Sequence, residues 1–259
     1  MKFALLQFSI SARAQVNYEK IKRAICEAEQ NGAQVLLTQE CALSGYPPIE
    51  IKSISDINFE QQEAAFSQIV ELVQEKKIYV FLGLVRRCGN KLANSVAIIQ
   101  PTGRVDYYDK RALWGWDAEH FTVDSDFDGV VDIQGVTVGV RVCYEVRFPE
   151  YFRELYKQNV DVVVISSCDI QKEFDANRYS ILKSHLLTRA IENVFTVISV
   201  NSASMEQTAP TCVVDQHGTT LVEAEHSADS MTYFDYQSLE NGFGAKGIIQ
   251  YADKLLGVN

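Results

Sequence analysis

Valine occupies every second position of residues 136–142, and small or polar residues fill the positions between. This period of two is typical of a β-strand. Beyond Pro149, apolar residues recur at helical spacing, and proline is tolerated in the first turn of a helix. The sequence therefore predicts a strand over residues 136–142, a helix that begins near Pro149, and a tight turn between them that carries Cys143.

The same two patterns recur along the chain. Amphipathic spacing predicts further helices over residues 16–31, 59–77 and 175–193. Apolar runs predict buried strands over residues 3–8, 33–39, 160–167 and 194–201. Turn-forming residues separate further predicted strands at residues 78–86, 92–100, 104–109, 211–215, 219–224 and 231–236. Residues 113–128 show no clear period and are predicted as a loop, and residues 240–259 are weakly patterned.

The order of these elements predicts the fold class. Helices alternate with near-continuous apolar strands, and hairpins interrupt them, which indicates an α/β architecture with one mixed sheet or two sheets. No linker divides the chain, so we expect a single domain over residues 1–259. The strand–helix–strand pattern of residues 3–40 recurs at residues 136–167, which suggests two similar halves packed together.

Composition narrows the class of protein. Apolar residues make up 47% and charged residues 22%, as in an ordinary soluble globular protein. The net charge is −10 and basic residues form no run, which argues against nucleic acid or an anionic membrane as a partner. The sequence has no recognisable signal peptide or membrane-spanning run. Six scattered cysteines form no CxxC pair and no cluster with histidine, so we expect reduced thiols, no metal site and a cytoplasmic location.

Three chemically distinct side chains follow predicted strands, namely Glu40, Lys110 and Cys143. Reactive groups gather at the carboxyl ends of strands in open α/β sheets. A carboxylate can take a thiol proton and later activate water, and a cysteine can attack an electrophilic carbon. An ammonium group can stabilise the negative charge that develops on the substrate oxygen. Together these groups supply what acyl transfer through a thiol requires.

Other interpretations of the cysteine remain open at this point. Free cysteine is among the most buried residue types, so Cys143 could be an inert core thiol. His120 lies in a candidate site loop and offers a Cys–His dyad as a rival mechanism, although the order of the chain gives that dyad no support.

Three segments carry a resemblance to a known family. They are Gln-Glu-Cys-Ala-Leu-Ser-Gly-Tyr-Pro-Pro at residues 39–48, Tyr-Asp-Lys-Arg at residues 108–111, and Gly-Val-Arg-Val-Cys-Tyr-Glu-Val-Arg-Phe-Pro-Glu at residues 139–150. In this order they resemble the nitrilase (carbon–nitrogen hydrolase) superfamily, and residues 188–193 and 215–218 are similar to its later segments. One motif alone would be weak, but the ordered set is specific and spans nearly the whole chain.

The resemblance implies a four-layer α-β-β-α sandwich with two mixed sheets, assembled into homodimers. It also implies hydrolysis of a non-peptide C–N bond through a thioester, without a metal or an organic cofactor. Carried over, Glu40 is the base, Lys110 stabilises the oxyanion and Cys143 is the nucleophile. Tyr144 after the cysteine resembles amidase-like members more than true nitrilases, which tend to carry tryptophan there.

The segment after Lys110 departs from the family pattern. Amide-cleaving members usually show a second glutamate there, followed by an aromatic residue and a glycine. We expect Glu119 to be this second acid because of its distance from Lys110. Asp117 is the alternative, since it stands four residues before Phe121, and the expected glycine is missing.

Substrate specificity is expected from the loops at residues 41–60, 111–128 and 168–178. The residues that we expect to contact the substrate are Tyr46, Trp114, Tyr144 and Ser167. Simple anchoring of a loop is an equally good interpretation of Trp114, because large aromatic side chains commonly bury loops. A simple turn explains Ser167 equally well.

The favoured function is an amidase-like enzyme that releases ammonia or an amine from a small linear amide. One alternative keeps the chemistry but acts on a small nitrile. Another is a catalytically inactive binding or assembly protein that has kept the fold, an idea motivated by the irregular segment around Glu119.

Overall fold

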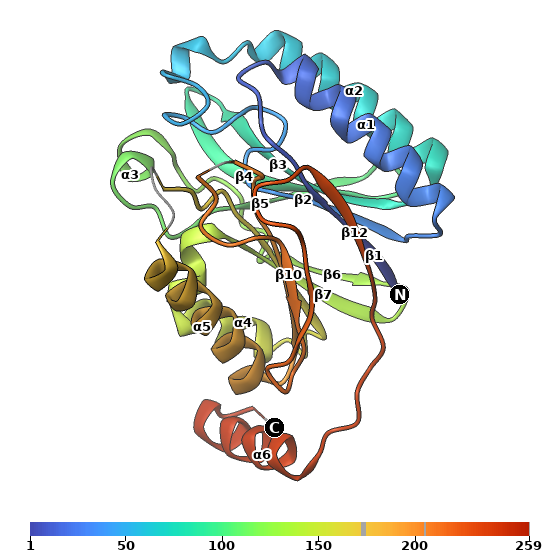
Figure 1. Cartoon of the computed structure of the whole chain (residues 1–259), viewed down its shortest axis with the longest axis vertical. Coiled ribbons are helices and arrows are strands. Elements are labelled where there is room, and N and C mark those ends of the chain that lie inside the picture. Colours follow the sequence, from blue (N-terminus) through green and yellow to red (C-terminus); the bar gives the residue numbers. More distant parts are fainter. Residues whose placement is uncertain (172–174, 205, 259) are drawn as a thin grey trace.

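The computed structural model describes residues 1–171, 175–204 and 206–258. Two six-stranded mixed sheets face each other, and helices cover their outer faces (Figure 1). The first sheet, in the order β12-β1-β2-β3-β4-β5, comprises β1 (Lys2–Gln7), β2 (Val35–Thr38), β3 (Tyr79–Cys88), β4 (Lys91–Ile99), β5 (Val105–Asp109) and β12 (Ser230–Asp235). The second, in the order β11-β10-β9-β8-β7-β6, comprises β6 (Val130–Ile133), β7 (Val136–Val142), β8 (Val162–Ser166), β9 (Thr196–Val200), β10 (Cys212–Val214) and β11 (Thr220–Glu223).

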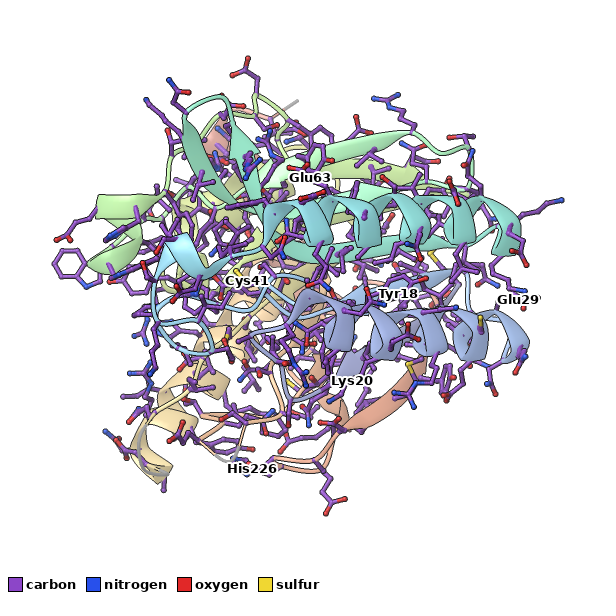
Figure 2. All side chains as sticks on the ribbon, turned by 90° about the horizontal axis from the view of Figure 1, so that it is seen from above. Tyr18, Lys20, Glu29, Cys41, Glu63 and His226 are labelled. Atoms are coloured by element: carbon purple, nitrogen blue, oxygen red, sulfur yellow. The ribbon has the colours of Figure 1, made fainter. Side chains whose placement is uncertain are left out.

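Six α-helices and two 3₁₀ turns complete the described part of the chain. The helices are α1 (Ala14–Gln30), α2 (Phe59–Lys76), α3 (Trp116–His120), α4 (Pro149–Tyr156), α5 (Ala176–Asn193) and α6 (Phe243–Leu256), and the 3₁₀ turns are η1 (Ile54–Asp56) and η2 (Cys143–Arg147). Helices α1 and α2 lie side by side on the outer face of the first sheet, as Figure 2 shows from above. Helices α4 and α5 cover the second sheet. None of the helices formed by the described residues is long and apolar enough to cross a membrane.

Strand periodicity explains the four layers. Alternate residues of β1 face opposite ways: Phe3 and Leu5 join the core between the two sheets, whereas Ala4 and Leu6 join the core beneath α1 and α2. In β7, the alternating valines of the sequence pattern enter the core between the sheets. The predicted α-β-β-α sandwich is therefore confirmed.

The two halves also follow a similar plan. Strands β1, β2 and β3 are parallel neighbours, as are β7, β8 and β9. Strand β5 is antiparallel to β4, which is antiparallel to β3, so β5 runs in the same direction as β2. The residues that follow β2, β5, β7 and β8 consequently emerge at one edge of the sandwich.

Three elements were not predicted from the sequence. Strand β6 is short, and helix α3 lies in the segment predicted as a loop. Helix α6 forms in the weakly patterned tail, where Gly244 and Gly247 interrupt the pattern and Phe243, Tyr251 and Leu255 are exposed. This helix contacts α4, since the Tyr156 hydroxyl donates to Asp253 Oδ1 at 2.6 Å.

The segment after β2 lies very close to β3. A Cβ atom on Gly83 would lie 2.2 Å from the carbonyl oxygen of Gln39 and 2.8 Å from the backbone nitrogen of Cys41. Both neighbours are backbone atoms, so neither can rotate away. Only glycine at this position of β3 lets the chain on both sides of Glu40 approach so closely.

The following loop contains a partly buried carboxyl group. Glu50 Oε2 accepts a hydrogen bond from the Tyr46 backbone N–H at 2.9 Å. Burial raises the pKa of Glu50 to about 7, although hydrogen bonds from backbone N–H groups oppose the rise. The protonated carboxyl group therefore persists in the folded protein at a pH where the unfolded chain has lost that proton.

Substitution of Gly83 by alanine should destabilise the protein by about 1–3 kcal/mol, because the methyl group must displace backbone. Gly247 in α6 has open space around its Cβ direction, so Gly247→Ala should be neutral or stabilise by roughly 0.5–1 kcal/mol. Urea unfolding measures both changes. Equal unfolding midpoints for Gly83→Ala and the wild type would contradict the close approach.

The pH dependence of stability should depend on Glu50. Because its folded pKa is about 7 and that of the unfolded carboxyl group is lower, the folded state binds more protons between these values. Glu50 therefore lowers the stability of the wild type progressively as the pH rises from about 4.5 to about 7. The melting temperature of Glu50→Gln minus that of the wild type should therefore be higher at pH 8 than at pH 5.

Exposed Glu63 on α2 supplies the matched control. For Glu63→Gln, the difference in melting temperature from the wild type should be the same at pH 5 and at pH 8. A difference for Glu50→Gln that also stays constant with pH would count against a buried, titrating Glu50.

Candidate functional site

The strand ends bring Glu40 and Lys110 into direct contact. Lys110 Nζ donates to Glu40 Oε1 at 2.9 Å, and the two side chains are only 3% and 1% exposed. Burial by itself lowers the pKa of Lys110, but Glu40 and other neighbouring groups more than offset this, so the pKa lies well above its ordinary value. Lys110 is therefore a permanent cation held inside the protein.

Two further groups fix the Glu40 carboxylate. Asn94 Nδ2 donates to Oε1 at 2.7 Å, and the Cys168 backbone N–H donates to Oε2 at 2.9 Å. Asn94 comes from β4, whereas Cys168 follows β8 in the opposite sheet. Glu40 thus joins the two sheets, and the backbone N–H of Glu40 adds a bond to the Ser167 carbonyl at 3.3 Å.

Cys143 lies at the junction of β7 and η2. Its φ of +43° is unusual for a residue with a side chain, so the turn is sharp and strained. Burial raises the pKa of the thiol well above its ordinary value, Glu40 raises it further, and Lys110 and a hydrogen bond from the Cys168 backbone lower it. The resting thiol therefore keeps its proton, with a carboxylate and an ammonium group close enough to affect its charge.

Asp117, and not Glu119, contacts the lysine. Lys110 Nζ donates to Asp117 Oδ2 at 2.6 Å, and the Tyr46 hydroxyl donates to Asp117 Oδ1 at 2.8 Å. Glu119 is exposed on the same helix, α3. Two residues span about 200° around a helix, so positions 117 and 119 face nearly opposite ways. Of the two acids considered from the sequence, Asp117 therefore lies against Lys110, and Glu119 lies on the exposed face of the helix.

The residues expected to contact the substrate lie in different surroundings. Trp114 is 74% exposed, whereas Ser167 is buried and is held by a backbone bond to the Val200 carbonyl. Tyr46 is partly buried and binds Asp117, and the ring of Tyr144 packs edge-on against Phe148. Tyr46 and Ser167 are thus hydrogen-bonded to members of the Glu40–Lys110–Asp117 cluster, whereas Trp114 and Tyr144 lie in the segments that follow Lys110 and Cys143.

Trp114 and Tyr144 line a shared cavity of about 470 Å³. Its wall is largely aromatic and carries one basic and one acidic side chain. The lining residues are Arg111, Ala112, Leu113, Trp114, Tyr144, Phe148, Glu150 and Tyr151. The cavity is formed by the segments that directly follow Lys110 and Cys143 in the chain.

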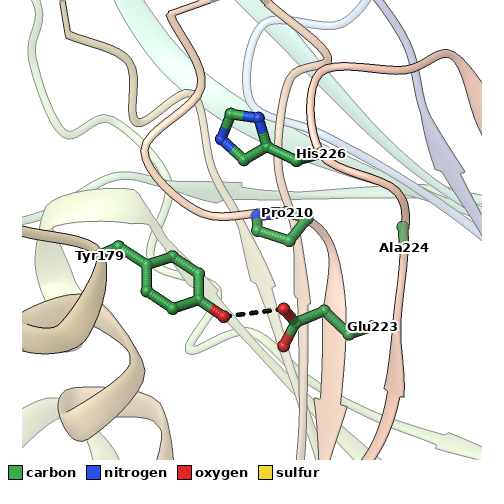
Figure 3. A pocket seen from close by; sticks show the side chains of 5 residues that line it. All are labelled: Tyr179, Pro210, Glu223, Ala224 and His226. Carbon is green, nitrogen blue, oxygen red and sulfur yellow. Dashed lines mark hydrogen bonds between the residues drawn. The ribbon is translucent and has the colours of Figure 1, made fainter. Parts of the chain in front are cut away.

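A second cavity, of about 520 Å³, lies on the side of α5 and β11 (Figure 3). Tyr179 and Glu223 are hydrogen-bonded to each other there at 2.7 Å, and Pro210, Ala224 and His226 complete the lining. The lining residues of neither cavity include a member of the Glu40–Lys110–Asp117 cluster. The slightly smaller cavity beside Tyr144 is formed by the segments that directly follow Lys110 and Cys143, so we place the functional site there, at the strand ends.

The histidine considered as a rival base has other contacts. His120 is exposed on α3, where its ring stacks on Trp116 with 4.0 Å between the centroids, and its Nδ1 lies 2.8 Å from the Trp116 carbonyl. Within residues 1–171, 175–204 and 206–258, no group of three or more His, Cys, Asp and Glu side chains could hold a metal ion.

Asn94 and the Cys168 N–H were not identified from the sequence as partners of Glu40. Asn94 had a signal, since the polar pair Asn94-Ser95 interrupts an otherwise apolar strand. The Cys168 N–H had none, because a backbone donor carries no mark in the sequence. Part of the loop at residues 168–178, expected to contribute to specificity, lies outside the described residues.

Several curated proteins are similar to the chain in sequence, at low sequence identity. A 2-oxoglutaramate amidase of Bacillus subtilis is 27% identical over 226 residues, which cover 84% of each chain. A citrullinase of Francisella tularensis is 24% identical over 265 residues, covering 93% of this chain and 91% of the relative. A nitrilase of Pyrococcus abyssi is 26% identical over 159 residues, covering 57% of this chain and 56% of the relative.

Solved structures of an amidase from Nesterenkonia sp. AN1 share the fold. One matches with a TM-score of 0.82 and 24% identity, covering 99% of this chain and 98% of the other. In another, a glutamate-to-leucine mutant with the same TM-score and identity, covering 99% and 95%, the acetamide moiety of fluoroacetamide is covalently added to the active-site cysteine. A family model of carbon–nitrogen hydrolases matches residues 2–239. With this match over nearly its whole length, the chain belongs to the carbon–nitrogen hydrolase family.

Proposed function

We propose that the protein hydrolyses the C–N bond of a small linear amide, with Cys143 as nucleophile and a thioester as intermediate. The observation that carries the proposal is the buried Glu40 carboxylate. It binds the Lys110 ammonium at 2.9 Å and the Cys168 N–H at 2.9 Å, and it raises the pKa of the neighbouring Cys143 thiol. A base, a cation and a thiol thus meet at one edge of the sandwich.

In the first half of the reaction, Glu40 accepts the thiol proton while Cys143 Sγ attacks the amide carbon. Because the pKa of the Cys143 thiol lies well above its ordinary value, we expect proton transfer and attack to be coupled. Lys110 Nζ stabilises the developing oxyanion, and removal of one such donor typically raises the barrier by about 3–4 kcal/mol. Glu40 then gives its proton to the leaving nitrogen, and ammonia departs from the acyl-thioester.

In the second half, Glu40 takes a proton from water as the water oxygen attacks the thioester carbon. The C–S bond breaks, the proton returns to the sulfur, and the carboxylic acid leaves. One amide and one water thus give one acid and one ammonia, and the enzyme returns to its starting state. No redox step and no cofactor is needed for this balance.

Asp117 takes the role that the sequence assigned to Glu119. It holds Lys110 from the side opposite Glu40, and Tyr46 in turn holds Asp117. An ammonium group shared by two carboxylates has one orientation, which directs its remaining N–H bond. We infer that Asp117 fixes Lys110 for the oxyanion and takes no proton from the thiol.

An amide is favoured over a nitrile by the residue after the nucleophile. Tyr144 stands where nitrilases tend to carry tryptophan, and relatives that the chain matches over most of its length include an amidase and a citrullinase. The aromatic cavity beside Tyr144, with Arg111 in its wall, suits a short substrate that carries a polar or acidic end. We therefore propose ω-amides and carbamoyl amines as the first substrates to test, with small nitriles alongside them.

Cys143→Ala should abolish ammonia release from every amide that the wild type hydrolyses, because no other group can form the thioester. Quenched wild-type reactions should contain one acyl group per chain on Cys143, detected by mass spectrometry of its peptide. Cys88 lies at the turn of the β3–β4 hairpin, and Cys88→Ala should keep wild-type activity. Ammonia release by Cys143→Ala at the wild-type rate would falsify the mechanism, and faster turnover of nitriles than of amides would favour the nitrilase.

Asp117→Asn should lower kcat/KM by about 10²-fold, since Lys110 loses one of the two charges that orient it. Glu119→Gln, which removes a charge from the exposed face of the same helix, should leave kcat/KM within about twofold of the wild type, as is usual for surface changes. Steady-state kinetics on one amide compare the two variants. The reverse order of effects would restore Glu119 as the second acid.

A further inference from the structure

A second fully buried carboxylate lies near the site and has no part in the proposed chemistry. Glu145, two residues after Cys143, is 0% exposed. Its Oε1 accepts the Arg111 backbone N–H at 2.7 Å, and its Oε2 accepts the Val142 backbone N–H at 2.7 Å. The Tyr108 hydroxyl donates to both oxygens, at 3.0 and 2.9 Å. Both oxygens of this carboxylate are therefore used by the protein itself.

The two backbone donors are available because both strands lack a neighbour at these points. On β7, the Val140 N–H reaches the Gly129 carbonyl at 2.8 Å on the side of β6. The Val142 N–H points to the same side, but β6 does not extend that far. On β5, the Lys110 N–H reaches Asn94 of β4, so the next N–H, that of Arg111, faces the open edge of the first sheet.

These donors flank two residues of the proposed triad. Arg111 directly follows Lys110, and Val142 directly precedes Cys143. One carboxylate thus joins the end of the strand that carries the lysine to the end of the strand that carries the cysteine, and the two strands belong to different sheets.

We propose that Glu145 is a positioning residue that sets the distance between Lys110 and Cys143. This inference rests on the proposed function, because it assigns Glu145 a role in aligning that triad. Glu145 touches neither the substrate nor the thiol, and it acts through the two backbone segments that it holds. Glu40 joins β2 to β8 in the same way, so each of the two carboxylates ties one sheet to the other beside the site.

The chemistry of the contact requires a glutamate. Two backbone N–H groups approach opposite oxygens, and each needs an acceptor. Glutamine offers only one acceptor oxygen, so its NH₂ group would face a backbone N–H, and one of the two segments would be released. Aspartate is one methylene shorter, so its carboxylate would be drawn back from the two donors that Glu145 binds at 2.7 Å.

Tyr108 fixes the orientation of the Glu145 carboxylate. Its hydroxyl accepts from Arg111 Nε at 3.2 Å and donates to Glu145. Its ring is buried between the sheets, and the space it fills exists because residue 129 is glycine: a Cβ there would lie 2.7 Å from the ring. Tyr107, the preceding residue, packs with the core beneath α1 and α2, on the other face of β5. Removal of the Tyr108 hydroxyl therefore loosens the contact without removing either backbone bond.

The test compares Glu145→Gln with a change at a carboxylate that accepts one backbone N–H at the other end of β7. Asp161 Oδ2 accepts the Thr137 backbone N–H at 2.8 Å, far from the site. Glu145→Gln should lower kcat by about 10²-fold with KM changed less than about threefold, since misplacement of reacting groups by about 1 Å has an effect of that size. Asp161→Asn should leave kcat within about twofold, as expected for a change away from the site.

The rate of alkylation of Cys143 by iodoacetamide, followed from pH 6 to pH 10, supplies a readout that needs no substrate. In Glu145→Gln the alkylation rate and its pH profile should shift from those of the wild type, because the thiol loses its alignment with Glu40 and Lys110. In Asp161→Asn both should match the wild type. If the wild type hydrolyses no amide, the proposed function fails, whereas the alkylation rates still decide the role of Glu145.

If Glu145→Gln does not fold, Tyr108→Phe and its matched control Tyr107→Phe test the proposed role of Glu145 instead. Tyr108→Phe should lower kcat by about tenfold, the equivalent of one hydrogen bond to a charged group, and Tyr107→Phe should not. A kcat for folded Glu145→Gln within threefold of the wild type, together with an unchanged alkylation profile, would overturn the proposal. So would equal kcat values for the two tyrosine variants where Glu145→Gln is unfolded.

Discussion

The structure depends on a buried ammonium group held between two buried carboxylates. Lys110 binds Glu40 at 2.9 Å and Asp117 at 2.6 Å, and all three side chains are nearly inaccessible to water. Removal of such charges from water costs several kcal/mol for each ion, and the ions' attraction offsets this only where further hydrogen bonds satisfy them. Asn94, the Cys168 N–H and the Tyr46 hydroxyl supply these bonds. The cluster can therefore exist only where three strand ends and two loops meet in one arrangement.

The rest of the fold provides that arrangement. The core between the sheets keeps them in register through alternating apolar residues, and Gly83 lets the chain around Glu40 approach β3. Direct bonds then tie the sheets together at the site. The Ser166 hydroxyl donates to the Thr38 carbonyl at 3.0 Å, and Glu40 accepts from Cys168. The site is thus built where the two sheets meet, and the segments after β2 and β5 add Tyr46 and Asp117 to it.

The sequence allowed much of this to be predicted, for identifiable reasons. Glu40, Lys110 and Cys143 each follow a strand, and strand ends can be read from the period of apolar residues. The choice between Asp117 and Glu119 could not be read in this way, because it depends on which face of the five-residue helix α3 points inward. Helix α6 was hidden by its glycines and by an exposed apolar face. The homodimer, the single-domain organisation and the cytoplasmic location stay predictions.

In the proposed mechanism, the charges of the site account for the use of the partly buried Cys143 thiol as a nucleophile. Glu40, Asp117 and Lys110 sum to one negative charge, which disfavours a thiolate beside them and agrees with the raised pKa of Cys143. Transfer of the thiol proton to Glu40 changes this balance without changing the total charge. Asp117 and Lys110 then form a neutral pair, and the thiolate of the proposed mechanism lies beside this pair without the negative charge of Glu40. The same transfer weakens the hold of Glu40 on Lys110, since a neutral carboxyl group attracts an ammonium group less strongly. In the proposed mechanism, Asp117 still holds Lys110 at this point, so the ammonium group keeps the orientation that directs its remaining N–H bond to the oxyanion.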